Sequence, residues 1–266
     1  MRVKDLFNLK GKVAIVTGAH AWLGYDMACA LAEAGCNIII TSRELSRAKE
    51  ATDKIANEYK VETLPLTMDQ RDYEQVKAMA EEAYKWKGHI DILINNAGGG
   101  SGKSEGNLFK RSPEDIVNMI NTNLTGVLFC CKEVGKYMVK QGYGKIINIG
   151  SIAGIVGRDR EMYRKTNKNE QPVDYAAAKA GVIGMTRDLA GLMSPYGVYV
   201  NCISPGGFYK DEPEQFVEAY SSRVMLGRMG RMNIDIKGAA LFLASPASDY
   251  ITGHNLVVDG GFSVWK

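Results

Sequence analysis

The chain of 266 residues lacks the features on which several specialised protein classes depend. Five cysteines without a CxxC pair and only three histidines predict neither a disulfide framework nor a metal site, so we expect the cysteines to be small buried apolar residues. A net charge of +3 is too small to favour nucleic acid or an anionic membrane as a partner. There is no run of about 18 apolar residues to span a membrane, and residues 1–10 show no secretion signal. We therefore expect a cytoplasmic protein.

Short apolar runs rich in β-branched residues alternate with longer segments of helical periodicity, which is typical of βαβ units that build a parallel sheet. The predicted strands cover residues 13–17, 37–42, 61–67, 91–94, 145–150, 198–203 and 255–258. The predicted helices cover residues 23–34, 45–59, 73–87, 113–141, 175–195, 213–226 and 234–245. No linker or repeat divides the chain, so we expect one α/β domain over residues 1–266.

Two segments interrupt this alternation, the glycine-rich 98–106 and the charged 157–172. Both follow predicted strands, where an open α/β sheet binds its ligand. The first strand also runs into a glycine-bearing turn, Thr17-Gly18-Ala-His-Ala-Trp-Leu-Gly24, before a helix. Such a turn offers backbone N–H groups and a helix N-terminus to a pyrophosphate, although glycine at this place serves chain geometry equally well.

Two further motifs carry chemistry. Residues 95–98 (Asn-Asn-Ala-Gly) close the fourth predicted strand, and Tyr175 and Lys179 lie one turn apart on one face of a predicted helix. A lysine ammonium beside a phenol favours the phenolate, so this tyrosine can donate or accept an alcohol proton. A second Tyr-x-x-x-Lys pair, Tyr73 and Lys77, has no serine-ending strand or glycine turn before it, and we interpret it as a solvated helix face.

Taken together and in order, these motifs resemble those of the short-chain dehydrogenase/reductase family over about residues 9–262. The matching motifs are Thr17-Gly18 with Gly24, Asp69, Asn95-Asn96-Ala97-Gly98, Asn123 in NTNLTG, Ser151 in INIGS, Tyr175 with Lys179, Pro205-Gly206, and VVDGG ending at Gly261. The resemblance implies a single-domain Rossmann fold, a doubly wound seven-stranded parallel sheet with helices on both faces. It also implies a homotetramer with the helices at 113–141 and 175–195 in its interfaces.

The resemblance assigns a role to each matching residue. Tyr175 would be the general acid/base, and Ser151 would form a hydrogen bond with the substrate oxygen. Lys179 would hold the nicotinamide ribose, and Asn123 would anchor a water that relays protons from Lys179. No metal is implied. The residues expected to bind the cofactor are Gly18, Trp22, Leu23, Gly24, Ser42, Arg43, Asp69 at the adenine, Gln70, Asn95 beside the adenosine ribose, Asn96, Ala97, Gly98, Tyr175, Lys179, Pro205, Gly206 at the nicotinamide, and Phe208.

The first departure from the family pattern is Trp22, which stands where the glycine turn usually has its middle glycine. That glycine allows close approach of the backbone to the pyrophosphate. The indole must therefore point away, reshape the turn or obstruct the cofactor. Because the backbone N–H of residue 22 remains, we expect binding to persist with weaker affinity, and Trp22→Gly to tighten it.

Two more departures concern the substrate side. Segment 157–172 lengthens the chain between Ser151 and Tyr175 and carries five basic and three acidic side chains. It either covers the pocket and presents a cation to an anionic substrate, or is a solvated loop or subunit contact. Residues 206–211 lack the threonine that often binds the carboxamide in the family, and we expect segment 206–226 to be the substrate lid.

The second predicted strand ends Thr41-Ser42-Arg43, without the acid that grips both ribose hydroxyls in NAD-preferring members. Arg43 can pair with a 2′-phosphate, which favours NADP over NAD, although Ala21 stands where many NADP-preferring members have a basic residue. Several phrases are most similar to gluconate 5-dehydrogenase-type members, so we expect an NAD(P)(H)-dependent oxidoreductase of carbohydrate metabolism that interconverts a secondary alcohol and a ketone, its substrate a sugar acid or polyol. The alternatives are a 3-ketoacyl-thioester reductase, or a non-catalytic dinucleotide sensor or scaffold if Trp22 blocks the site.

Overall fold

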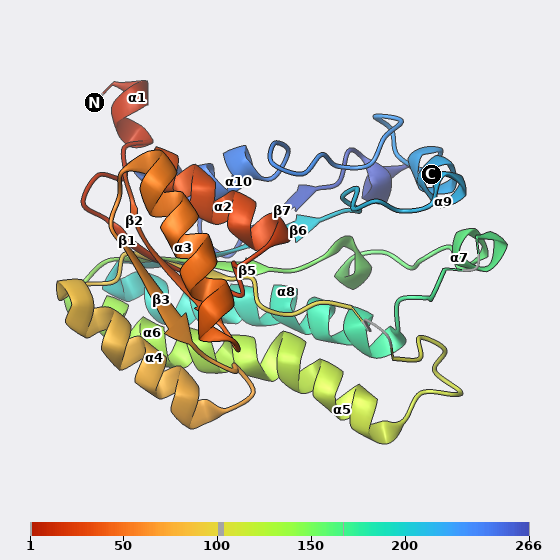
Figure 1. Cartoon of the computed structure of the whole chain (residues 1–266), viewed down its shortest axis with the longest axis horizontal. Coiled ribbons are helices and arrows are strands. Elements are labelled where there is room, and N and C mark those ends of the chain that lie inside the picture. The colour runs from red at the N-terminus through yellow and green to blue at the C-terminus, as the bar shows by residue number, and fades with distance from the viewer. Residues whose placement is uncertain (1, 101–103, 167, 266) are drawn as a thin grey trace.

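The computed structural model describes residues 2–100, 104–166 and 168–265, so parts of segments 98–106 and 157–172 lie outside the described residues. Seven strands form one parallel sheet in the order β3-β2-β1-β4-β5-β6-β7 (Figure 1). The strands are β1 Val13–Thr17, β2 Asn37–Ser42, β3 Thr63–Thr67, β4 Ile92–Asn95, β5 Gly144–Ile149, β6 Val198–Pro205 and β7 Asn255–Val258. The predicted seven-stranded sheet is confirmed. Its order reverses between β1 and β4, which opens a crevice at the carboxyl ends of these two strands.

Helices cover both faces of the sheet (Figure 1). They are α1 Val3–Leu6, α2 Trp22–Glu33, α3 Leu45–Tyr59, α4 Tyr73–Lys87, α5 Pro113–Ile120, α6 Gly126–Gln141, α7 Glu161–Lys165, α8 Val173–Met193, α9 Glu214–Ser221 and α10 Lys237–Ala244. Helices α2, α3 and α10 pack on one face and α4, α6 and α8 on the other. In the part of the chain that the structure describes, no helix combines the length and hydropathy needed to cross a bilayer.

The central strands are buried along almost their whole length because both of their faces are covered. In β1, Ala14 and Val16 belong to the core under α2 and α10, whereas Val13 and Ile15 belong to the core under α4 and α6. All four side chains are fully buried, and each larger one stabilises the fold by about 1.5–3 kcal/mol. The sheet is thus a rigid platform for the loops at its carboxyl edge.

The predicted helix 113–141 is two helices joined by a π-helical turn at Asn121–Thr125. A Cβ on Gly126, which begins α6, would lie 2.7 Å from the backbone oxygen of Gln70. The chain therefore approaches this loop closely where the helix is irregular. Such π-helical turns occur frequently at functional sites, and this one carries Asn123.

Part of the charged insert 157–172 packs against α9, while much of its charged surface is exposed. Helix α7, not predicted from the polar sequence, buries Met162 and Tyr163 against Phe216 and Tyr220 of α9. Figure 1 shows α7 and α9 next to each other at the end of the molecule reached by the carboxyl ends of the strands.

Candidate active site

The turn after β1 is braced by the loop after β4. Asn96 Nδ2 donates to the backbone oxygens of Thr17 at 3.0 Å and Gly18 at 3.3 Å. Gly18 has φ +63°, and a Cβ there would lie 2.9 Å from Ala97 Cα. A Cβ on Gly24 would lie 2.3 Å from Asn96 Nδ2. The close approach of the two loops therefore requires both glycines, whatever they bind.

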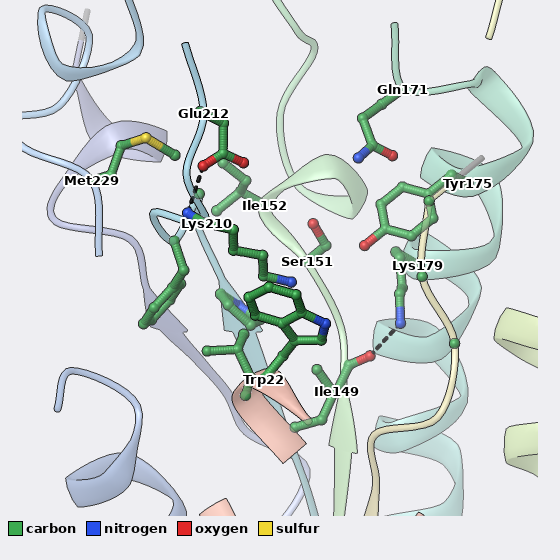
Figure 2. Close-up of a pocket in the computed structure, with 18 of the residues that line it drawn as sticks. Trp22, Ile149, Ser151, Ile152, Gln171, Tyr175, Lys179, Lys210, Glu212 and Met229 are labelled. Carbon is green, nitrogen blue, oxygen red and sulfur yellow. Dashed lines mark hydrogen bonds between the residues drawn. The ribbon is translucent and has the colours of Figure 1, made fainter. Parts of the chain in front are cut away.

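Trp22 begins α2 with φ +56°, in the left-handed region that favours glycine. Its side chain is 54% exposed, and Figure 2 shows the indole projecting into the pocket. The Lys210 Nζ lies 4.6 Å from the ring centre. The indole therefore does not point away from the pocket. The backbone of residue 22 keeps the left-handed conformation that favours glycine.

Three of the four predicted catalytic side chains line this pocket. Lys179 Nζ donates to the Ile149 backbone oxygen at 2.7 Å and lies 5.7 Å from the centre of the Tyr175 ring. Ser151 follows β5, and its Oγ accepts from Ala153 N at 3.1 Å. Figure 2 shows the Tyr175 hydroxyl directed toward Ser151. The spacing of Tyr175 and Lys179 along α8 thus places both beside the end of β5.

A buried ion pair fixes the start of α8. Arg111 Nε donates to Asp174 Oδ2 at 2.9 Å, with side-chain exposures of only 1% and 4%. Arg111 Nη2 also donates to the Asp115 backbone oxygen at 3.1 Å. Asp174 directly precedes Tyr175, so the pair ties Tyr175 to the chain before α5.

Asn123 lies behind the glycine loop after β4. Its Oδ1 accepts from Gly99 N at 2.9 Å, and its Nδ2 donates to the Met119 backbone oxygen at 3.2 Å. The residue is buried and lines a second cavity beside the first. The proton-relaying water that Asn123 is expected to anchor remains a prediction.

The two cavities have volumes of about 520 and 610 Å³ and share Gly18, Asn96 and Gly98. The first, on the β5 and β6 side, is lined by Trp22, Leu23, Gly24, Ser151, Tyr175, Lys179, Pro205, Gly206 and Phe208. The second, on the β2 and β3 side, is lined by Ser42, Arg43, Asp69, Gln70, Ala97 and Asn123. Every residue in the predicted cofactor set except Asn95 therefore lines the crevice.

Asn95 is a correction. It is 1% exposed, and its Nδ2 donates to Asn148 Oδ1 at 2.9 Å inside the core. Successive residues of a strand point to opposite faces. Asn95, the last residue of β4, therefore points into the core, whereas Asn96 points into the crevice.

The second cavity is rich in arginine. Arg43 is exposed, and among the described residues no carboxylate lies within ion-pair distance of it. Arg47 pairs with Glu44 at 2.9 Å. Burial, with Arg47 nearby, lowers the pKa of His20, which lines both cavities. Sequence reasoning missed His20 and Arg47, although Arg47 lies one helical turn beyond Arg43.

Asp69 also lines this cavity, but its carboxylate is engaged by Arg71 Nη2 at 2.6 Å. Hydrogen bonds from Arg71 lower the pKa of Asp69. The contact of Asp69 with an adenine stays a prediction. In that contact the adenine and Arg71 would share the carboxylate oxygens of Asp69.

Tyr73, of the second Tyr-x-x-x-Lys pair, is half-buried against α6. Its hydroxyl donates to Glu133 Oε1 at 2.5 Å, and its ring lies 5.1 Å from that of Phe129 on α6. Lys77 is exposed. Neither residue lines the two cavities, and Tyr73 serves helix packing.

Comparison with known proteins identifies the family. A family model described as enoyl-(acyl carrier protein) reductase matches residues 18–263. The chain belongs to the short-chain dehydrogenase/reductase family. It is 36% identical over 259 residues to a 3-oxoacyl-[acyl-carrier-protein] reductase of Aquifex aeolicus, covering 96% of this chain and 98% of that protein. It is 35% identical over 266 residues to a 2-dehydro-3-deoxy-D-gluconate 5-dehydrogenase of Dickeya dadantii, covering 98% of each.

A solved short-chain dehydrogenase/reductase structure has the same fold. It is a gluconate 5-dehydrogenase from Burkholderia cenocepacia in complex with NADP and tartrate, with TM-score 0.89, 31% identity, and coverage of 98% of this chain and 99% of that chain. The present chain is thus an oxidoreductase of this family.

The crevice fits the dinucleotide that the family binds. Two adjoining cavities meet at the β1–α2 turn, and Arg43, which has no ion pair among the described residues, offers positive charge in one of them. Lys179 and Ser151 lie in the other. Trp22 is the misfit, because its indole projects into the crevice and must turn aside for a ligand that passes the turn.

Proposed function

We propose that this protein is an NAD(P)(H)-dependent oxidoreductase that interconverts a secondary alcohol and a ketone. The observation that carries the proposal is that Ser151, Tyr175 and Lys179 line one cavity beside the glycine turn. The cofactor, when bound, supplies or accepts the hydride. The chain's own residues then manage the substrate oxygen and its proton.

In the reductive direction, Ser151 Oγ donates a hydrogen bond to the carbonyl oxygen. Tyr175 gives its phenolic proton to the same oxygen as the carbon gains the hydride, so the products are an alcohol and a phenolate. The Lys179 ammonium favours that phenolate, and a water held at Asn123 returns the proton. Such acid catalysis contributes about 10²–10⁴-fold in rate. Oxidation reverses each step.

We propose NADP as the preferred cofactor. Arg43 is exposed, and no carboxylate of the described residues lies at ion-pair distance from it. Its guanidinium can therefore pair with the 2′-phosphate. Glu44 is engaged by Arg47, so it is less available to grip ribose hydroxyls. The Burkholderia cenocepacia relative, which holds NADP, supports this choice.

The proposed substrate is a sugar acid or a related polyol. We also propose that the protein acts in carbohydrate metabolism in the cytoplasm. Support comes from the sugar-acid dehydrogenases among the relatives and from the cations Arg158, Lys168 and Lys210 along the first cavity. The alternative substrate is a 3-ketoacyl thioester, which the Aquifex aeolicus relative favours. The cover formed by α7 and α9 would be the substrate lid.

We further propose a homotetramer assembled through α5, α6 and α8. These helices leave large apolar side chains at the surface, with Val117 57%, Leu128 44% and Leu192 63% exposed. Light scattering of the purified protein tests this, and a monomeric mass at micromolar concentration contradicts it.

The variant Tyr175→Phe tests the function. We expect turnover of keto-sugar acids with NADPH to fall by about 10²–10⁴-fold, while the dissociation constant of NADPH stays unchanged. Tyr73→Phe is the matched control, because it removes a tyrosine hydroxyl outside the crevice. If the wild-type protein binds NADPH but turns over neither keto acids nor ketoacyl esters, the non-catalytic sensor replaces the enzyme. If it binds neither NADPH nor NADH, Trp22 blocks the site.

A further inference from the structure

The basic side chains of the insert are engaged by carboxylates, with one exception. Ion pairs join Arg160 to Glu170 at 2.9 Å, Arg164 to Glu170 at 3.4 Å, Lys165 to Glu161 at 2.9 Å and Lys168 to Glu212 at 3.2 Å. Arg158 has no carboxylate within ion-pair distance among the residues that the structure describes. Its neighbour Asp159 is taken by Arg223 of the α9 segment, at 2.9 Å from Nε. Within the described residues, Arg158 is thus the basic side chain of the insert that forms no ion pair.

Arg158 lies at the reacting end of the first cavity. Its guanidinium carbon is 5.8 Å from the centre of the Tyr175 ring, and the side chain lines the cavity together with Ser151. Nη1 donates to the Tyr163 hydroxyl at 3.1 Å. Tyr163 is itself 5% exposed within the α7–α9 core, so it holds the guanidinium in place. An arginine fixed at one nitrogen beside the catalytic tyrosine is pre-organised to bind an anion.

The other cavity cations are less suited to this role. Lys168 is paired with Glu212, and its Nζ lies 4.0 Å from the centre of the Phe216 ring. Lys210 lies over Trp22, at the glycine turn. Arg158, by contrast, lies beside the ring of Tyr175, as Lys179 does.

We propose that Arg158 binds a carboxylate of the substrate and thereby selects ketones and alcohols that carry an acid group. The guanidinium fork matches a carboxylate in a bidentate way, and the half-buried position strengthens the pair relative to an exposed one. This inference rests on the proposed function and deepens it, because it names the residue that distinguishes a sugar acid from a neutral polyol. Arg158 is then a specificity-determining residue and takes no part in proton transfer.

The test compares two ligands that differ only in this group. Calorimetry measures the binding of D-gluconate and of D-sorbitol, in which a CH₂OH group replaces the carboxylate, to the wild-type protein and to Arg158→Gln. We expect the wild type to bind gluconate more tightly than sorbitol. In Arg158→Gln we expect a loss of about 10–100-fold for gluconate, as for a charged hydrogen-bonded pair, and no loss for sorbitol. Arg158→Lys should retain part of the preference, because it keeps the charge without the fork.

Arg164→Gln is the matched control. It removes an insert arginine that is 72% exposed and already paired with Glu170, so gluconate binding should stay as in the wild type. The proposal is overturned if the wild type binds gluconate no better than sorbitol, or if Arg158→Gln weakens both ligands equally, as loss of a merely structural residue would. Turnover of 5-keto-D-gluconate with NADPH is measured alongside. If the wild type binds gluconate through Arg158 but does not turn over 5-keto-D-gluconate, the proposed oxidoreduction is rejected and the proposed anion site is retained.

Discussion

The Lys210 ammonium lies 4.6 Å from the centre of the Trp22 ring, so two departures from the family pattern meet across the crevice. Trp22 replaces the middle glycine of the first turn, and Lys210 belongs to the segment after Pro205-Gly206 that lacks the usual threonine. Burial lowers the pKa of Lys210. A cation held over an aromatic face is stabilised by about 0.5–2 kcal/mol, so the indole and the ammonium keep each other in the crevice.

Trp22→Gly should tighten NADPH binding, because it removes the indole from the path of the ligand and frees the ammonium of Lys210. It should also raise the unfolding temperature, since relief of a left-handed non-glycine residue is worth about 1 kcal/mol. Trp22→Ala is the comparison variant, because it removes the indole but keeps a Cβ at φ +56°. It should gain affinity without gaining stability. Calorimetry and thermal unfolding measure the two effects, and an unchanged dissociation constant in both variants means that the indole is harmless.

Arg43→Ala should weaken NADPH binding by about tenfold or more, the worth of a charged hydrogen-bonded pair, and leave NADH binding unchanged. The reason is that only NADPH carries the 2′-phosphate. Lys49→Ala serves as control, because Lys49 pairs with Asp53 on the exposed face of α3. Equal losses for the two dinucleotides would argue against a 2′-phosphate site at Arg43.

The sheet was predictable because its central strands are buried on both faces. Runs such as Val13–Thr17 and Asn37–Ser42 are mostly apolar and end at polar residues, so local sequence alone sets their bounds. The grouping of the proposed catalytic side chains was predictable for a related reason: Ser151 follows the end of β5, and Tyr175 and Lys179 lie one turn apart on α8.

What the sequence could not supply depends on contacts between distant segments. Met162 and Tyr163 stand in a charged stretch, and only α9, some fifty residues later, makes them a core. The side to which Asn95 turns depends on the strand register, and the direction of the Trp22 indole depends on Lys210. The lack of an ion pair at Arg158 likewise becomes visible only in the structure, which shows that the neighbouring carboxylates pair with other basic side chains.

Arg111→Met should destabilise the fold by about 3–5 kcal/mol, because it leaves the buried Asp174 carboxylate without its counter-ion. The double variant Arg111→Met/Asp174→Asn should recover much of that loss, since it removes both charges. Urea unfolding of the two single variants and the double variant gives the coupling energy. Additive losses would show that the two side chains act independently of each other.

Asp235 should make stability depend on pH in the acid range. Its Oδ2 accepts from Arg228 Nη1 at 2.6 Å and from Arg231 N at 2.8 Å, and its Oδ1 accepts from Arg231 Nη2 at 2.8 Å. These hydrogen bonds hold the pKa of Asp235 well below its usual range. A carboxyl whose folded pKa is depressed stabilises the fold above its unfolded pKa of about 4, and that contribution disappears as the pH falls toward the folded value.

Asp235→Asn should therefore cost about 1–2 kcal/mol at pH 7, and the gap to the wild type should narrow steadily below about pH 4. The effect reaches the lid, because Tyr209 N donates to the Gly230 backbone oxygen at 2.9 Å in the segment that Asp235 holds. Urea unfolding at pH 7, 5 and 3 measures the gap. Asp53→Asn is the control, since its exposed pair with Lys49 contributes less than about 1 kcal/mol. A gap for Asp235→Asn that is the same at pH 7 and pH 3 would mean that the side chain acts through shape alone, because only the ionised carboxylate gains from the two arginines.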